Sequence, residues 1–64
     1  MSSEPMTAEI GEAMEIALNM AIPMAWEAIW VEKEGRIAFF EHGVEKGSAR
    51  TPKEAGAWML RIYG

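Results

Sequence analysis

The sequence predicts an α+β domain in which two helices flank an antiparallel β-hairpin or a small three-stranded sheet. Three observations support this class. Apolar residues recur at helical spacing before residue 22, two β-rich segments flank Glu34-Gly35, and Thr51-Pro52 opens a second helical pattern. A chain of 64 residues has room for one core, so residues 1–64 are treated as a single domain.

The first helix is expected to start near Thr7, a good N-cap residue, and to stop before Pro23. The residues expected to face the core are Ile10, Ala13, Met14, Ala17, Leu18 and Ala21. The opposite, solvated face is expected to hold Glu9, Glu12, Glu15 and Asn19. Ile16 lies among these polar residues, and we interpret it as a single stray apolar side chain.

A β-hairpin is predicted from residues 24–33 and 36–42, with Glu34-Gly35 as a two-residue turn. This register pairs Lys33 with Arg36, Trp30 with Phe39, and Glu27 with His42. Slipping it by one residue would exchange the two faces of the sheet.

The two hairpin faces differ in composition. The face expected to form the core carries Ile29, Val31, Ala38 and Phe40. The other carries what we call the aromatic stripe, which consists of Trp26, Trp30, Ile37 and Phe39. Either the helices cover opposite faces of the sheet, or the stripe is open to a partner. Because a covering helix would bury Glu32 and Glu41, we expect an open stripe.

The last third of the chain is predicted to form a turn at 43–47, an optional short strand at 48–50, and a helix. Thr51 is the expected N-cap, Pro52 the first helical residue and Glu54 the third. The helix face expected to dock on the sheet holds Ala55, Trp58, Met59 and Ile62.

The composition excludes most catalytic chemistry, because the chain has no cysteine, aspartate or glutamine and a single histidine. We interpret His42 and Glu27 as a cross-strand ion pair, and the glycines of 43–47 as turn residues. The methionines are expected to fill the core rather than to form a binding surface. We therefore predict no catalytic, cofactor-binding or metal-ligating residue, and no enzyme.

Charge is distributed unevenly along the chain. Residues 1–32 contain six glutamates and no lysine or arginine, whereas residues 33–64 contain six cations and four glutamates. The acidic half suits a basic protein partner and makes nucleic acid an unlikely one. The N-terminal residues do not resemble a signal peptide, and no apolar stretch is long enough to span a bilayer. We expect a cytoplasmic protein with no membrane contact.

One segment resembles a known family. Residues 47–55, Gly-Ser-Ala-Arg-Thr-Pro-Lys-Glu-Ala, resemble the third strand and second helix of double-stranded-RNA-binding domains, whose order of one helix, three strands and one helix is also the order expected here. The resemblance implies phosphate contacts at the second helix, where Arg50 and Lys53 stand in place of a lysine cluster. A strand followed by Thr-x-x-Glu-Ala and a tryptophan-bearing helix also resembles the arm-binding domains of phage integrases.

The sequence favours a small non-enzymatic protein-binding module. In size and acidity it is similar to phage-encoded inhibitors of host defence proteins, anti-CRISPR proteins among them. The alternative is a nucleic-acid-binding module of the double-stranded-RNA-binding type. The partner is expected to be a basic protein or a second copy. The residues predicted to bind it are Trp26, Trp30, Glu32, Ile37, Phe39 and Glu41 on the hairpin, and Glu9, Glu12 and Glu15 on the first helix.

Overall fold

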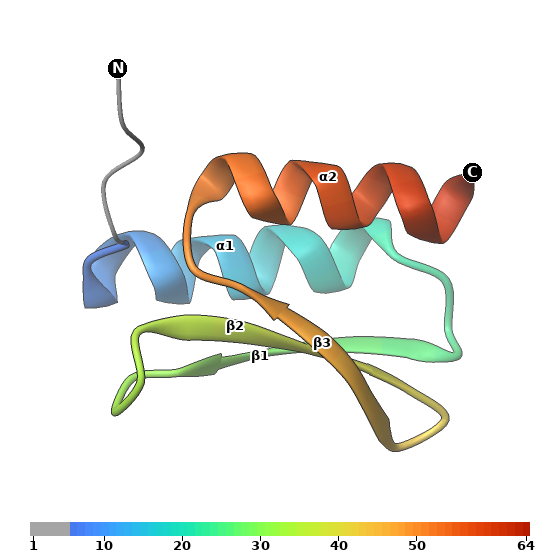
Figure 1. The fold of residues 1–64 in the computed structure, drawn as a ribbon, viewed down its shortest axis with the longest axis horizontal. Helices are drawn as coiled ribbons and strands as arrows, with labels where there is room; N and C mark the ends of the chain where they lie inside the picture. The colour runs from blue at the N-terminus through green and yellow to red at the C-terminus, as the bar shows by residue number, and fades with distance from the viewer. Residues whose placement is uncertain (1–5) are drawn as a thin grey trace.

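The computed structural model describes residues 6–64, which form two helices and a three-stranded antiparallel sheet (Figure 1). The elements in chain order are α1 (Ala8–Ala21), β1 (Trp26–Val31), β2 (Arg36–Glu41), β3 (Val44–Ala49) and α2 (Pro52–Tyr63). The strands lie in the sheet in the order β1-β2-β3. The predicted α+β class is confirmed. The third strand is longer than residues 48–50 and occupies most of the predicted turn at 43–47.

Both helices begin at the predicted caps. The Thr7 hydroxyl accepts a hydrogen bond from the amide of Ile10 at 3.3 Å, and the Thr51 hydroxyl accepts one from the amide of Glu54 at 3.1 Å. The Glu54 carboxylate in turn accepts from the amide of Arg50 at 2.7 Å, one residue before the cap. These bonds satisfy amides that have no partner inside the helix, which fixes where each helix starts.

The hairpin register differs from the predicted one by two residues. Trp30 lies opposite Ile37, and residues 32–35 form a four-residue connection instead of a two-residue turn. Gly35 ends this connection with a φ of 66°, and its amide donates to the Val31 carbonyl at 2.8 Å. A shift of two residues keeps every side chain on its predicted face, because strand side chains alternate with a period of two.

The predicted ion pair between Glu27 and His42 is wrong. Phe40 lies opposite Glu27, and His42 occupies the turn between β2 and β3 with a φ of 52°. His42 is exposed, and its amide donates to the Ala25 carbonyl at 2.8 Å. Its role in the structure is that of a turn residue.

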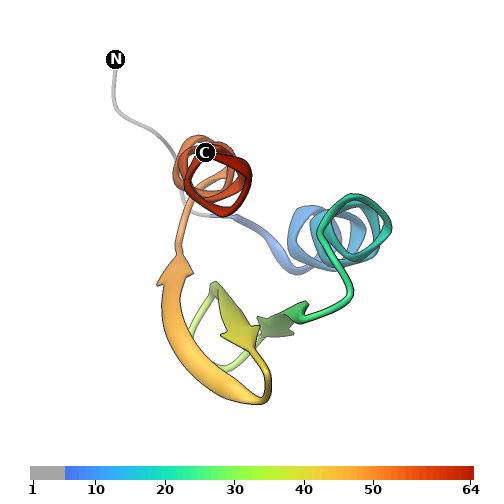
Figure 2. The same ribbon diagram turned by 90° about the vertical axis from the view of Figure 1, so that its right-hand side faces the viewer.

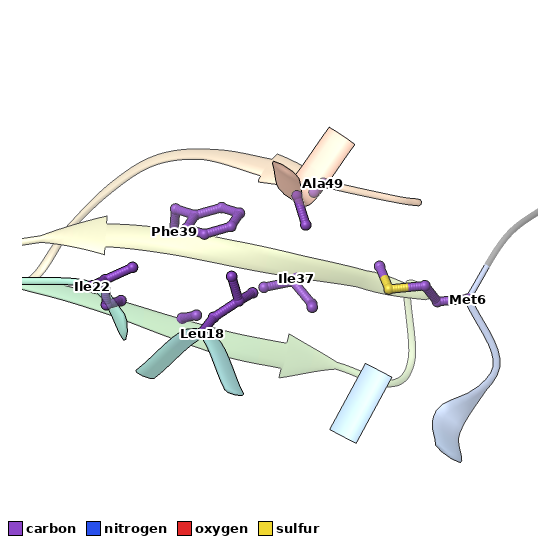
Figure 3. Close-up of a cluster of buried hydrophobic side chains, with 8 residues drawn as sticks. Met6, Leu18, Ile22, Ile37, Phe39 and Ala49 are labelled. Atoms are coloured by element: carbon purple, nitrogen blue, oxygen red, sulfur yellow. The ribbon is translucent and has the colours of Figure 1, made fainter. Parts of the chain in front are cut away.

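Both helices cover the same face of the sheet (Figure 2). That face is the aromatic stripe, because Ile37 and Phe39 are 0% exposed and pack in a cluster with Leu18 of α1 and Ala55 of α2. Figure 3 shows Ile37, Phe39 and Leu18 within this core. The expectation of an open aromatic stripe is therefore wrong, and Ile37 and Phe39 are core residues rather than partner contacts.

The two carboxylates that motivated the open stripe lie at the ends of this face. Glu32 belongs to the connection after β1 and is exposed, while Glu41 is the last residue of β2. Covering the stripe therefore buries neither charge completely. It also buries the face with the larger apolar side chains, which is the more favourable choice.

The opposite sheet face has no helix over it. Ile29, Val31 and Phe40 are half-buried on this face, and only the small Ala38 between them is fully buried. This face was expected to be the core, and that expectation is wrong.

The ends of the two helices meet at one place. The Tyr63 hydroxyl of α2 donates a hydrogen bond to the Ala21 carbonyl at the end of α1. Elsewhere each helix packs mainly on the strand that is its neighbour in the chain, α1 on β1 and α2 on β3.

Candidate functional site

The side of α1 that meets the sheet matches the predicted one only in part, since Leu18 and Met14 pack on the core as predicted. Gly11 and Leu18 are buried and Met14 is half-buried, whereas Ala13 and Ala17 are exposed. The helix is therefore rotated relative to the expectation. Polar contacts between α1 and the edge of β1 account for the rotation.

Asn19 binds the outer edge of β1 as a neighbouring strand would. Its side-chain oxygen accepts from the Ala28 amide at 2.8 Å, and its side-chain nitrogen donates to the Ala28 carbonyl at 2.8 Å. One carboxylate oxygen of Glu15 accepts from the next outward amide, that of Trp30, at 2.9 Å. These contacts satisfy backbone groups that an edge strand otherwise leaves unpaired.

Sequence reasoning placed both residues on a solvated face and so missed this role. The one available signal is an asparagine inside the helix, two residues before its end, since asparagine has a low helix propensity. Glu15 is half-buried, and its carboxylate accepts a hydrogen bond from the backbone amide of Trp30. This carboxylate is therefore engaged within the domain, which argues against its predicted role in partner binding. Glu9 and Glu12 are exposed, as predicted.

A contiguous apolar surface faces away from the core. We call it the outer face of α1, and it consists of Ala13, Ile16, Ala17 and Met20 together with Met24 in the loop that follows. Ile16, Met20 and Met24 are 63%, 83% and 104% exposed. The three are spaced four residues apart, and Ile16 and Met20 lie one helical turn apart on one face. Ile16 is thus part of a patch, and neither Met20 nor Met24 fills the core.

Trp30 has a structural role. Its ring lies over Gly11, where an added Cβ would overlap the indole. Its indole Nε1 is buried without a hydrogen-bond partner among residues 6–64. The part of the ring that packs on α1 is not available to a partner, and the residue as a whole is half-buried.

Trp26 and Glu41 lie at the other end of the same sheet face. Trp26 is half-buried with its ring centroid 6.3 Å from that of Trp58 in α2. Glu41 lies beside this pair at the rim of a surface pocket. Of the six residues predicted on the hairpin, Ile37 and Phe39 are buried, Trp26, Trp30 and Glu41 are half-buried, and Glu32 is exposed.

The hairpin end carries an ionic network. The Arg36 guanidinium donates to the Glu34 carboxylate and, at 2.9 Å, to that of Glu45. The hydrogen bond from Arg36, helped by its charge, lowers the pKa of Glu34, and the two carboxylates raise the pKa of Arg36. Arg50 also donates to the Glu34 carbonyl at 3.1 Å. This network fastens β3 and its C-terminal continuation to the hairpin, and its residues are engaged with one another.

Within residues 6–64 no group of three histidine or carboxylate side chains is placed to hold a metal ion. Neither described helix has the length and apolar content needed to cross a membrane. In comparisons with known proteins, no family model, no curated protein and no solved structure matches this chain.

Proposed function

We propose that this chain is a stoichiometric protein-binding domain, an inhibitor or adaptor with no reaction of its own, and that it binds through the outer face of α1. One observation carries the proposal. Ile16 and Met20 are 63% and 83% exposed and lie one helical turn apart on α1, and Met24 in the loop that follows is 104% exposed. Monomeric proteins rarely leave such a patch uncovered without a use.

The shape of the patch suits a groove on the partner. Two large side chains one turn apart, with Ala13 and Ala17 beside them, form the ridge that an amphipathic helix inserts into an apolar cleft. Methionine is unbranched and polarisable, so Met20 and Met24 can adapt to the cleft wall.

The negative charge of α1 indicates which residues the partner carries beside its apolar groove. Glu9 and Glu12 are exposed at the start of α1, and residues 1–32 contain no lysine or arginine. Neither glutamate makes an ion pair with another residue in the described part of the chain. A partner with basic residues beside its apolar groove would complement them, whereas a second copy would bring the same glutamates.

The alternative is a module of the double-stranded-RNA-binding type, because such domains share the element order α-β-β-β-α seen here, with both helices on one sheet face. Few cations are available to bind RNA phosphates at the second helix. Arg50 donates a hydrogen bond to the Glu34 carbonyl, and Lys53 is next to Glu54 in the chain. Binding to duplex RNA is therefore an outcome of the test rather than the proposal.

The test uses two matched surface variants. Ile16→Ser combined with Met20→Ser removes the patch, and Leu60→Ser changes an equally exposed apolar residue, 77% exposed, on α2. Proteins retained by the immobilised wild type and by Leu60→Ser, but not by the double variant, are purified and titrated by calorimetry. We expect one-to-one binding that the double variant weakens by at least about tenfold.

Three results would contradict the proposal. The first is a partner bound equally by the double variant. The second is a dimer in sedimentation that the double variant abolishes, which would assign the face to a second copy. The third is tight binding of duplex RNA in a gel shift that Glu9→Lys and Glu12→Lys strengthen, because the same charge reversal should slow association with a basic protein.

A further inference from the structure

A second surface, separate from the outer face of α1, is a pocket between α2 and one end of the sheet. Its volume is about 270 Å³, close to the lower limit for small-molecule sites and enough for one ring. The pocket is lined by Trp26, Glu41, Lys46, Trp58, Arg61 and Ile62.

The aromatic wall of this pocket is fixed before any ligand arrives. Trp58 stacks on the buried Phe39 with centroids 5.2 Å apart and planes 16° apart. Its indole Nε1 donates to the Ser48 carbonyl at 3.1 Å. A Cβ on Gly47 would overlap the Trp58 ring, so glycine at this position leaves space for it. Trp26 forms the second wall, tilted by 56° to the first.

The rim of the pocket is positively charged overall. The Arg61 guanidinium lies over the Trp58 ring, 4.8 Å from its centroid. Stacking uses the flat face of a guanidinium and leaves its N–H edges free to bind an anion. Lys46 and Arg61 make no ion pair with other residues between 6 and 64, and Glu41 is the single carboxylate among the lining residues.

We propose that this pocket binds a small molecule with one aromatic ring and one anionic group. Because Phe39 and Arg61 cover the two faces of the Trp58 ring, the ligand ring would lie against Trp26 and the edge of Trp58, and Arg61 and Lys46 would hold the anion. A carboxylate and a phosphate both satisfy this chemistry. The proposal does not depend on the protein-binding function of α1, because the two surfaces share no residue.

Glu41 gives the proposal a directional test. A carboxylate at the rim opposes a bound anion, so Glu41→Gln should strengthen binding of an aromatic anion. The same change should weaken the binding of a zwitterionic aromatic amino acid whose ammonium group contacts Glu41.

The experiment follows the three tryptophan indole N–H signals by NMR during titration. The probes are phenylacetate and AMP, each with a neutral counterpart, phenylacetamide and adenosine. We expect the signals of Trp26 and Trp58 to shift and that of Trp30, which packs on Gly11 outside the pocket, to stay. The neutral counterparts, and the variants Arg61→Gln and Lys46→Gln, should bind roughly tenfold more weakly. Lys33→Gln, in the connection between β1 and β2, is the charge control and should bind as the wild type does.

The two anions distinguish the sources, since preference for AMP identifies a phosphate ligand and preference for phenylacetate a carboxylate ligand. The proposal is overturned if neither anion shifts Trp26 or Trp58 up to about 10 mM. It is also overturned if the neutral counterparts bind equally, or if Glu41→Gln weakens the binding of both anions.

Discussion

Gly11 and Gly56 are both helical glycines, and their surroundings predict opposite effects of alanine. In α1, a Cβ on Gly11 would overlap the Trp30 ring, whereas Gly56 in α2 is exposed and has nothing within 4 Å of an added Cβ. Alanine gains up to about 1 kcal/mol over glycine in a helix interior, and overpacking a core costs about 1–3 kcal/mol. At Gly11 the cost of overpacking exceeds the gain in helix propensity, so alanine should destabilise the fold. At Gly56 there is no overpacking, and only the gain remains.

We expect Gly11→Ala to lower the free energy of unfolding and Gly56→Ala to raise it by about 0.5–1 kcal/mol. Urea denaturation of the two variants beside the wild type measures both changes. Stabilisation by Gly11→Ala would mean that Trp30 can move away from α1 without cost, and the close helix–sheet contact described here would then be wrong.

At the scale of elements, the position of α1 depends on the contacts of Asn19 with the edge of β1. Asn19→Ala removes two hydrogen bonds to Ala28 and leaves its backbone groups dependent on water. We expect a loss of about 1–3 kcal/mol in the free energy of unfolding. Glu12→Ala, an exposed change on the same helix, should stay within about 0.5 kcal/mol of the wild type. Equal effects of the two substitutions in thermal melts would show that the edge contact does not stabilise the fold.

The elements themselves could be predicted from sequence because their signals are local. A threonine hydroxyl at the cap, the proline after Thr51 and the glycine near the hairpin turn act within a few residues of themselves. The packing could not be predicted in the same way. Which side of α1 meets the sheet depends on Asn19 and Glu15 reaching β1, and that contact exists only after the chain has folded.

The candidate site was mispredicted for the same reason. The strand pattern correctly separated two faces, but both faces are apolar, and local patterning cannot say which of them the helices cover. The predicted hairpin places Glu32 and Glu41 among the residues of the aromatic stripe, whereas a four-residue connection and the end of β2 place them at its ends. The exposed patch of Ile16 and Met20 is missed because Ile16 is interpreted as a single stray apolar residue and the methionines are interpreted as core residues.

For the molecule as a whole, the assignment of the covered sheet face can be tested at two adjacent residues. Phe39 is 0% exposed beneath the helices, while Phe40 is half-buried on the face without helices. Phe39→Ala should cost about 3–5 kcal/mol, a large part of the roughly 3–10 kcal/mol expected for a domain of this size. Phe40→Ala should cost less than about 2 kcal/mol, because part of its ring is already in water. Circular dichroism melts compare the stability of the two variants. A larger loss from Phe40→Ala than from Phe39→Ala would mean that the helices cover the face that carries Phe40.

The order of the strands in the sheet has a consequence for how the chain reaches this structure. Because β1, β2 and β3 lie side by side in chain order and each helix packs on its sequence neighbour, most ordering steps close only short loops. Two-state domains of mixed α and β structure fold at rates between those of helical bundles and those of all-β domains. The hydrogen bond from Tyr63 to Ala21 is the exception, since it joins the two helices across the length of the sheet-forming segment. Because this bond joins residues 42 positions apart, its formation closes a longer loop than either hairpin does.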